Sequence, residues 1–116
     1  MKFRKTGALL IAAVFLLTVF LYGCGIRVPA EKADYVGEWE GPEMYLSIAP
    51  NGHVEYKRRQ GRTETTISGP LQEFKGNDFL VGIPFLTATF VVSKPPYKEG
   101  DTWKMVVDGV ELTKVR

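Results

Sequence analysis

The chain has 116 residues, of which 45% are hydrophobic and 24% are charged, so it has room for one domain with one core. The formal net charge is +2, but three of the fifteen basic residues and none of the thirteen acidic residues precede Cys24. The remainder therefore carries twelve basic and thirteen acidic residues, a net charge of −1. This balance argues against a nucleic-acid binder, which needs a basic face.

Residues 1–23 have the three-part pattern of a secretory signal peptide. A cationic head, MKFRKTG, precedes the fifteen-residue uncharged stretch ALLIAAVFLLTVFLY, and Gly23 is the small residue before the expected cut. At 1.5 Å per residue this stretch reaches only about 22 Å as a helix, short of a ~30 Å hydrocarbon core. A cleaved signal peptide is therefore favoured, with an uncleaved helical anchor or a plain signal peptide and a free thiol as alternatives.

The residues LYGC, which are Leu21, Tyr22, Gly23 and Cys24, resemble the lipobox of bacterial lipoproteins. This resemblance implies diacylglycerol on the Cys24 thiol, cleavage by the lipoprotein signal peptidase before Cys24, and acylation of the new amino terminus. Cys24 is the only cysteine, so it has no internal disulfide partner, and lipid would remove a free thiol that export makes a liability. The expected partner is thus a membrane, reached through the lipid.

The residue after the cysteine bears on location. In the enteric form of the lipoprotein signal, an aspartate there retains the protein in the inner membrane, whereas this chain has Gly25. The resemblance therefore implies the outer membrane, facing the periplasm, in an organism with two membranes. Residues 24–34 are expected to be the lipidated cysteine and a flexible or extended linker.

Residues 35–116 predict an all-β domain. Short alternating apolar and polar runs recur between turn signals, and no long window shows helical spacing. We expect strands near 35–40, 43–49, 53–59, 63–68, 71–75, 78–83, 85–92, 102–107 and 110–115. A small antiparallel meander of this length should curl into a closed or nearly closed barrel, or form two packed sheets.

Two hairpins can be predicted in register. Asp108-Gly109 between apolar runs indicates a two-residue turn that pairs Met105 with Leu112. In the segment LSIAPNGHVEY, the apolar residues of the two strands lie on the same face only if the loop between them has three residues, Pro50-Asn51-Gly52, with Gly52 at positive φ. At that position Gly52→Val should destabilise the domain, and Gly52→Asn should cost less.

The most apolar segment of the domain is residues 79–92. Alternation places one set of its side chains toward the core, and Pro84 should break or bend the sheet. The expected inward set is Phe79, Val81, Ile83, Leu86, Ala88, Phe90 and Val92.

Gly37-Glu38-Trp39 is similar to the Gly-x-Trp that opens the first strand of lipocalins. In that family the tryptophan plugs one end of an eight-stranded barrel around a cavity, but lipocalins run much longer than this domain. Two hypotheses follow: Trp39 anchors the core of a small filled barrel, or the domain binds a hydrophobic ligand in a cavity.

The sequence predicts no catalytic, metal or cofactor site. His53 is the only histidine in the sequence and adjoins a turn, so no second histidine is available for a metal site. Glu38 and Glu40 lie on the same face of a predicted strand, which is expected for a face exposed to solvent. No phosphate loop, dinucleotide fingerprint or Gly-x-Ser-x-Gly motif is present in the sequence. We therefore expect no enzyme.

The remaining surface feature is a basic cluster on a predicted hairpin tip, made of Lys57, Arg58, Arg59 and Arg62. It is either a solvated turn that guards a strand end or a contact for anionic headgroups, phosphate or an acidic partner. The sequence thus predicts an envelope lipoprotein with a non-catalytic β domain that has a binding or structural role. A small hydrophobic-ligand binder and a periplasmic hydrolase inhibitor are the alternatives.

Overall fold

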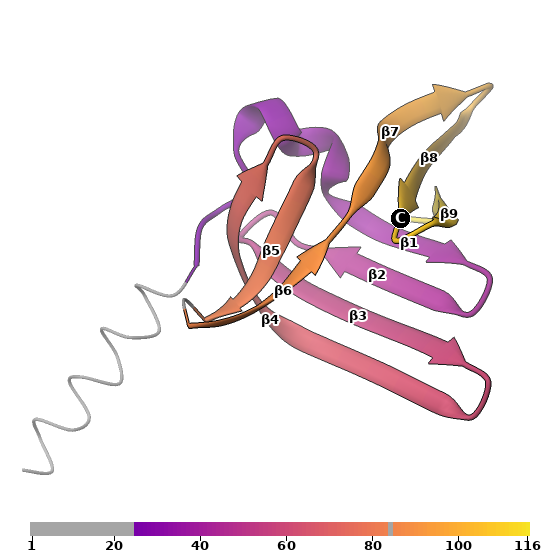
Figure 1. The fold of residues 1–116 in the computed structure, drawn as a ribbon. Helices are drawn as coiled ribbons and strands as arrows, with labels where there is room; N and C mark the ends of the chain where they lie inside the picture. The colour runs from indigo at the N-terminus through magenta and orange to yellow at the C-terminus, as the bar shows by residue number, and fades with distance from the viewer. Residues whose placement is uncertain (1–24, 84) are drawn as a thin grey trace, which may run out of the picture.

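The computed structural model describes residues 25–83 and 85–116, and within them it contains one 3-10 helix and nine strands (Figure 1). The predicted lipobox residues 21–24 and Pro84 lie outside the described residues. The elements are η1 (Ala30–Tyr35), β1 (Gly37–Gly41), β2 (Met44–Ile48), β3 (His53–Gln60), β4 (Thr63–Lys75), β5 (Asp78–Ile83), β6 (Leu86–Phe90), β7 (Val92–Glu99), β8 (Thr102–Val107) and β9 (Val110–Lys114).

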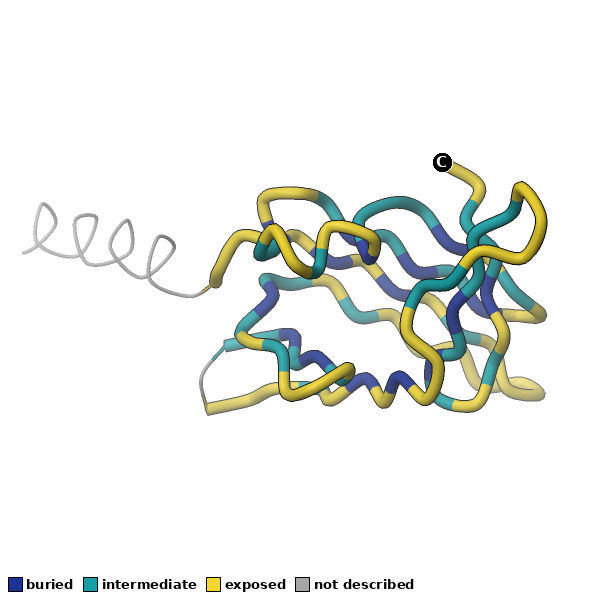
Figure 2. The backbone as a smooth tube through the Cα atoms, turned by 90° about the horizontal axis from the view of Figure 1, so that it is seen from above, coloured by how far each residue is buried: buried dark blue, intermediate teal, exposed yellow. Residues whose placement is uncertain are grey.

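All nine described strands belong to one antiparallel sheet in the order β6-β5-β4-β3-β2-β1-β9-β8-β7. Each strand pairs with its neighbour in sequence, except that β6 does not pair with β7, while β9 pairs with β1. The sheet therefore curls on itself as an all-β half-barrel whose open edges are β6 and β7 (Figures 1 and 2). Of the architectures left open by the sequence, this one is nearest to the incompletely closed barrel.

Both predicted hairpin registers are confirmed. Met105 pairs with Leu112 across a turn in which Asp108 and Gly109 have φ of 49° and 80°. Ile48 pairs with Val54 across the three-residue loop, and Gly52 has φ of 94°. Turn chemistry and apolar alternation specify the same register in each case, which is why local sequence is sufficient here.

A continuous apolar core lines the inside of the curl. Trp39 is fully buried, and Phe79 stacks on Phe90 with ring centroids 5.0 Å apart. Tyr56 meets the edge of Phe90 at 4.9 Å, which joins β3 to β6 through their side chains. The buried hydrophobic residues are Tyr35, Trp39, Met44, Leu46, Ile48, Val54, Tyr56, Leu71, Phe79, Val81, Phe90, Val92, Met105, Val107 and Leu112.

Three strand predictions need correction. Residues 63–75 form the single strand β4, with a register shift between Leu71 and Glu73, rather than two strands. The predicted strand 85–92 ends at Phe90, and β7 begins at Val92. β7 was not predicted; it contains two prolines and is an edge strand with irregular register, where proline is tolerated.

Leu86 is a further correction. Its register with Ile83 points it to the inner face as predicted, yet its side chain is 72% exposed. Leu86 is the first residue of β6, next to the β5–β6 turn, and its side chain borders a solvent-open groove, whereas Phe90 at the other end of β6 is buried. Phe79, Val81, Phe90 and Val92 are buried as predicted, whereas Ile83 and Ala88 are half-buried.

The segment 25–34, expected as a flexible linker, is instead bonded to the domain. Ile26 N donates to Leu71 O at 2.9 Å, and Val28 N donates to Pro50 O at 3.1 Å. η1 follows, and buried Tyr35 packs edge-on against Phe74 with centroids 5.0 Å apart. The N-terminal segment thus fills the place where β4 diverges from β3, which local sequence cannot reveal.

Candidate functional site

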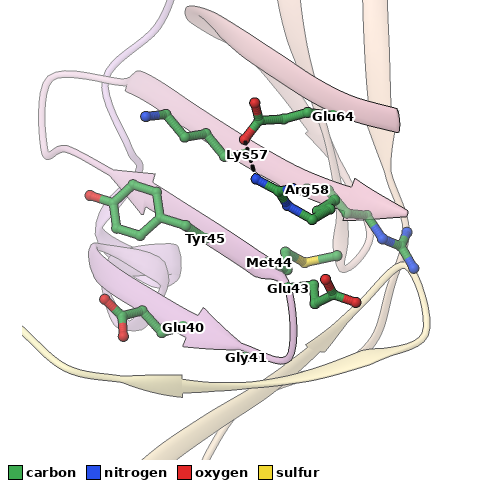
Figure 3. Close-up of a pocket in the computed structure, with 9 residues that line it drawn as sticks. Glu40, Gly41, Glu43, Met44, Tyr45, Lys57, Arg58 and Glu64 are labelled. Carbon is green, nitrogen blue, oxygen red and sulfur yellow. Dashed lines mark ion pairs between the residues drawn. The ribbon is translucent and has the colours of Figure 1, made fainter. Parts of the chain in front are cut away.

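A charged cleft of about 300 Å³ lies between the β1–β2 turn and the β3–β4 hairpin (Figure 3). Its lining comes from the ends of β1 and β2, from β3 and from the start of β4. The lining residues are Glu40, Gly41, Glu43, Met44, Tyr45, Lys57, Arg58, Arg59 and Glu64. Both views of the whole chain place these hairpin turns at the end of the domain opposite the start of the described chain (Figures 1 and 2).

Strand pairing sets the order of side chains across this cleft. Tyr45 pairs with Glu40 on one side and with Lys57 on the other, so acid, phenol and amine form one row on the outer face (Figure 3). Arg58 pairs with Met44 and, by alternation with buried Tyr56, belongs to the inner-facing set at the open end. The cleft therefore combines the outer face with the rim of the half-barrel.

The predicted basic cluster is only partly assembled. Lys57, Arg58 and Arg59 line the cleft, whereas Arg62 is in the exposed turn and is not among the lining residues. Three carboxylates line the same cleft and balance the three cations. Arg59 Nη2 lies 3.9 Å from Glu64 Oε2. The site is thus a mixed-charge surface rather than a purely basic patch.

Sequence reasoning missed the acidic half of this cleft, although one signal was present. A two-residue turn at Gly61-Arg62 pairs Arg59 with Glu64, as the structure has it. The contribution of Glu43 depends on the β1–β2 turn folding toward β3, where Arg59 N donates to Glu43 O at 2.9 Å. The predicted hairpin register also contained this signal, because pairing Ile48 with Val54 sets Glu43 opposite Arg59.

The residues considered for catalysis have ordinary structural partners. His53 Nε2 lies 3.2 Å from Glu55 Oε2 on an exposed face beside the turn. Glu38 accepts from Tyr45 Oη and from Arg116 Nε, each at 3.3 Å, and this contact raises the pKa of the Arg116 guanidinium. Within residues 25–83 and 85–116, no three His, Cys, Asp or Glu side chains are grouped so that they could hold a metal ion.

Trp39 is a buried anchor of the core. Its Nε1 donates to Tyr35 O at 2.9 Å, and the Lys114 ammonium lies 4.9 Å from its ring centroid. Lys114 Nζ also donates to Asp34 O at 3.0 Å, which fastens the end of η1 to β9. Burial lowers the pKa of Lys114. Trp39 therefore links β1 to the end of η1 and to β9 by hydrogen-bond and cation–π contacts.

A second concave surface, here called the apolar groove, lies along β4, β5 and β6 with a volume of about 460 Å³. Inner-facing residues Ile67, Ile83 and Leu86 line it, together with Pro70. The carbon that a side chain at Gly25 would add lies 2.6 Å from Pro70 Cβ, so the start of the described chain adjoins this groove. We call the part of the molecule around Gly25, Pro70 and the β5–β6 turn the entry end, and the part with the charged cleft the cleft end.

The two ends are well separated. Five residues of β4 lie between Glu64 in the cleft and Pro70 at the entry end, and these six residue steps correspond to about 20 Å of extended strand. In the described ranges, no helix has the length and apolar character needed to cross a membrane. No protein-family model, curated protein or solved structure matches this chain.

Proposed function

We propose that this protein is a lipid-anchored lipoprotein of the cell envelope whose β domain is a non-catalytic binding module. The LYGC segment supports lipid on Cys24, and Gly25 after it supports the outer membrane, facing the periplasm, where the organism has two membranes. The observation that carries the proposal is that two features of the domain lie at its opposite ends. The chain enters at one end, directly after Cys24, and the charged cleft lies at the other.

The cleft favours a protein partner over an anionic lipid. Three cations and three carboxylates line the cleft together, so a surface of phosphates would meet repulsion as well as attraction. The half-buried Tyr45 ring adds apolar contact area between these charges. A partner surface that carries both signs of charge around an apolar centre fits this arrangement.

The anchor is tested by labelling cells with a radioactive fatty acid. Wild type should incorporate label and be cleaved, whereas Cys24→Ala should remain an unlabelled precursor, because lipid addition precedes cleavage in the lipoprotein pathway that LYGC resembles. Thr113→Ala is the matched control and should be labelled like wild type. Wild-type levels of label in Cys24→Ala would disprove the assignment.

The partner surface is tested by photo-crosslinking in intact cells. A crosslinking amino acid at Lys57, in the cleft, should give one discrete adduct, and the same amino acid at the exposed Lys98 should not. The adduct should weaken when Glu64→Gln and Glu40→Gln are introduced together. Equal adducts at both lysines would remove the cleft from the proposal.

A second candidate function, binding of a small hydrophobic ligand, is favoured by the apolar groove. Ala88 lines the groove and is half-buried, so Ala88→Trp should fill it. If ligand binding is the function, organic extraction of wild-type protein should release a stoichiometric apolar molecule that Ala88→Trp no longer carries. An empty extract from wild type leaves the protein-binding proposal as the better one.

A further inference from the structure

The exposed apolar side chains of the described residues are unevenly distributed. Five large ones are exposed, and three of these, Ile26, Phe85 and Leu86, lie at the entry end. Phe85 is 79% exposed at the β5–β6 turn. Figures 1 and 2 both show this turn at the same end of the domain as the point where the described chain begins.

The β5–β6 turn differs from the other hairpin turns in the described chain. Those turns contain glycine or charged residues, as solvated turns do, at 42–43, 50–52, 61–62, 76–77, 100–101 and 108–109. The β5–β6 turn instead exposes an aromatic ring followed by leucine. An exposed apolar cluster of this kind marks a surface that meets an apolar partner.

The position of Cys24 identifies the partner. Gly25, the residue after Cys24 in the sequence, packs on Pro70, and Ile26 N is bonded to Leu71 O, so the described chain is held against the β domain from its first residues. Consecutive Cα atoms lie only about 3.8 Å apart, so a lipid on the preceding residue would be attached close to this point. Acyl chains on Cys24 would therefore bring the entry end against the bilayer.

We propose that the β5–β6 turn inserts Phe85 and Leu86 into the interfacial region of the bilayer that holds the lipid on Cys24. Arg27 is exposed beside Ile26 and would lie at the level of the anionic headgroups. The turn then acts as a second membrane contact that fixes the tilt of the half-barrel and directs the charged cleft away from the membrane. This inference rests on the proposed lipid anchor and deepens it.

The test uses the full-length, lipid-modified protein in vesicles of phosphatidylethanolamine and phosphatidylglycerol, with or without brominated acyl chains. Phe85→Trp introduces a fluorescent probe at the turn, and Leu86→Trp provides a second one. Gln60→Trp is the matched control, since Gln60 is exposed beside the β3–β4 turn at the cleft end. Wild type supplies the background of Trp39 and Trp103.

Brominated lipid should extinguish most of the fluorescence added by Phe85→Trp and Leu86→Trp, and aqueous iodide should have little effect on it. Gln60→Trp should show the reverse. The inference is overturned if iodide reaches the Phe85→Trp probe as it reaches the Gln60→Trp probe. It is equally overturned if neither quencher reaches the Phe85→Trp probe, because another copy of the chain would then cover the turn.

Fatty-acid label on the same samples separates the two proposals. Labelled protein whose turn is not quenched by brominated lipid would refute the turn insertion and leave the anchor intact. Unlabelled wild-type protein would refute the anchor, and the insertion with it.

Discussion

The entry end and the cleft end of the half-barrel are built from different interactions. At the entry end, backbone hydrogen bonds from Ile26 and Val28 join the N-terminal segment to β4 and the β2–β3 loop, and the exposed side chains are apolar. At the cleft end, two hairpins project side chains of both charges into solvent. The core and the entry end therefore contribute most to the stability of the fold, whereas the cleft end carries the charged surface on which the proposed partner binding depends.

The largest expected effect comes from the core beneath the cleft. Leu112 is fully buried, and a carbon added at Gly41 would lie 2.8 Å from Leu112 Cδ2, so this leucine supports the floor of the cleft. Leu112→Ala should lower the free energy of unfolding by about 2–5 kcal/mol, as truncation of a buried leucine does. Urea unfolding measures it.

Thr113 on the same strand provides the control. It lies on the opposite face and is half-buried, so Thr113→Ala should change stability by less than about 0.5 kcal/mol. A larger loss for Thr113→Ala than for Leu112→Ala would mean that β9 presents its other face to the core.

Two glycines at positive φ compare the ends directly. Gly52 has φ of +94°, and a Cβ there would collide with Ile26 O, whereas Gly61 has φ of +63° and nothing within 4 Å of such an atom. Gly61→Ala should cost about 1–2 kcal/mol from backbone strain alone. Gly52→Ala should cost about 2–4 kcal/mol, because overpacking is added to that strain.

Thermal and urea unfolding of both variants measure this difference. The sequence-based expectation that Gly52→Asn is milder than Gly52→Val considered only φ, and the contact with Ile26 now predicts that every side chain at Gly52 is disruptive. Equal losses at Gly52 and Gly61 would indicate that the N-terminal segment does not hold the entry end.

The changed expectation for Gly52 shows which features of the fold local sequence can predict and which it cannot. Alternation and turn residues predicted the hairpins around Gly52 and Gly109, because both signals act within about ten residues. The docking of Ile26 on Leu71 joins residues far apart in the chain, and nothing local in the segment 26–34 marks it. The segment was therefore predicted to be a linker, because it contains a proline and several charged residues.

The candidate site was partly predictable for the same reason. Its cations stand together in the sequence and were identified, but Glu43 and Glu64 reach the cleft through two different hairpin turns. The exposure of Leu86 could not be foreseen either, because alternation gives the face of a residue and not where along β6 the core ends, and Phe90 on the same face is buried.

A substitution at Tyr35 tests how much η1 contributes to the attachment of the N-terminal segment to the β domain. Its hydroxyl donates to Asn77 O at 2.8 Å, and burial, with a smaller contribution from the Asp78 charge, raises its pKa from 10.0 to about 12. Tyr35→Phe removes this hydrogen bond and should cost about 1 kcal/mol at neutral pH.

The pH dependence of Tyr35 has a definite sign. The unfolded chain releases the phenolic proton near pH 10 and the folded protein near pH 12, so the folded state binds this proton more tightly. Stability from this group is complete below pH 10 and is lost as the pH rises to 12. Urea unfolding of wild type should therefore show a decline in that window that is shallower in Tyr35→Phe. Parallel curves would contradict the assignment.

The smallest expected effect lies at the cleft end and completes the comparison. The side chains of Arg59 and Glu64 are 60% and 57% exposed, and their closest charged atoms are 3.9 Å apart. Water and salt screen such a pair, so Glu64→Gln should change the free energy of unfolding by less than about 0.5 kcal/mol. The same substitution removes one of three carboxylates from the cleft, and it should therefore reduce the Lys57 crosslink in cells although the fold is unchanged. Loss of stability without loss of crosslinking would reverse the comparison, because the charges of the cleft end would then serve the fold and not a partner.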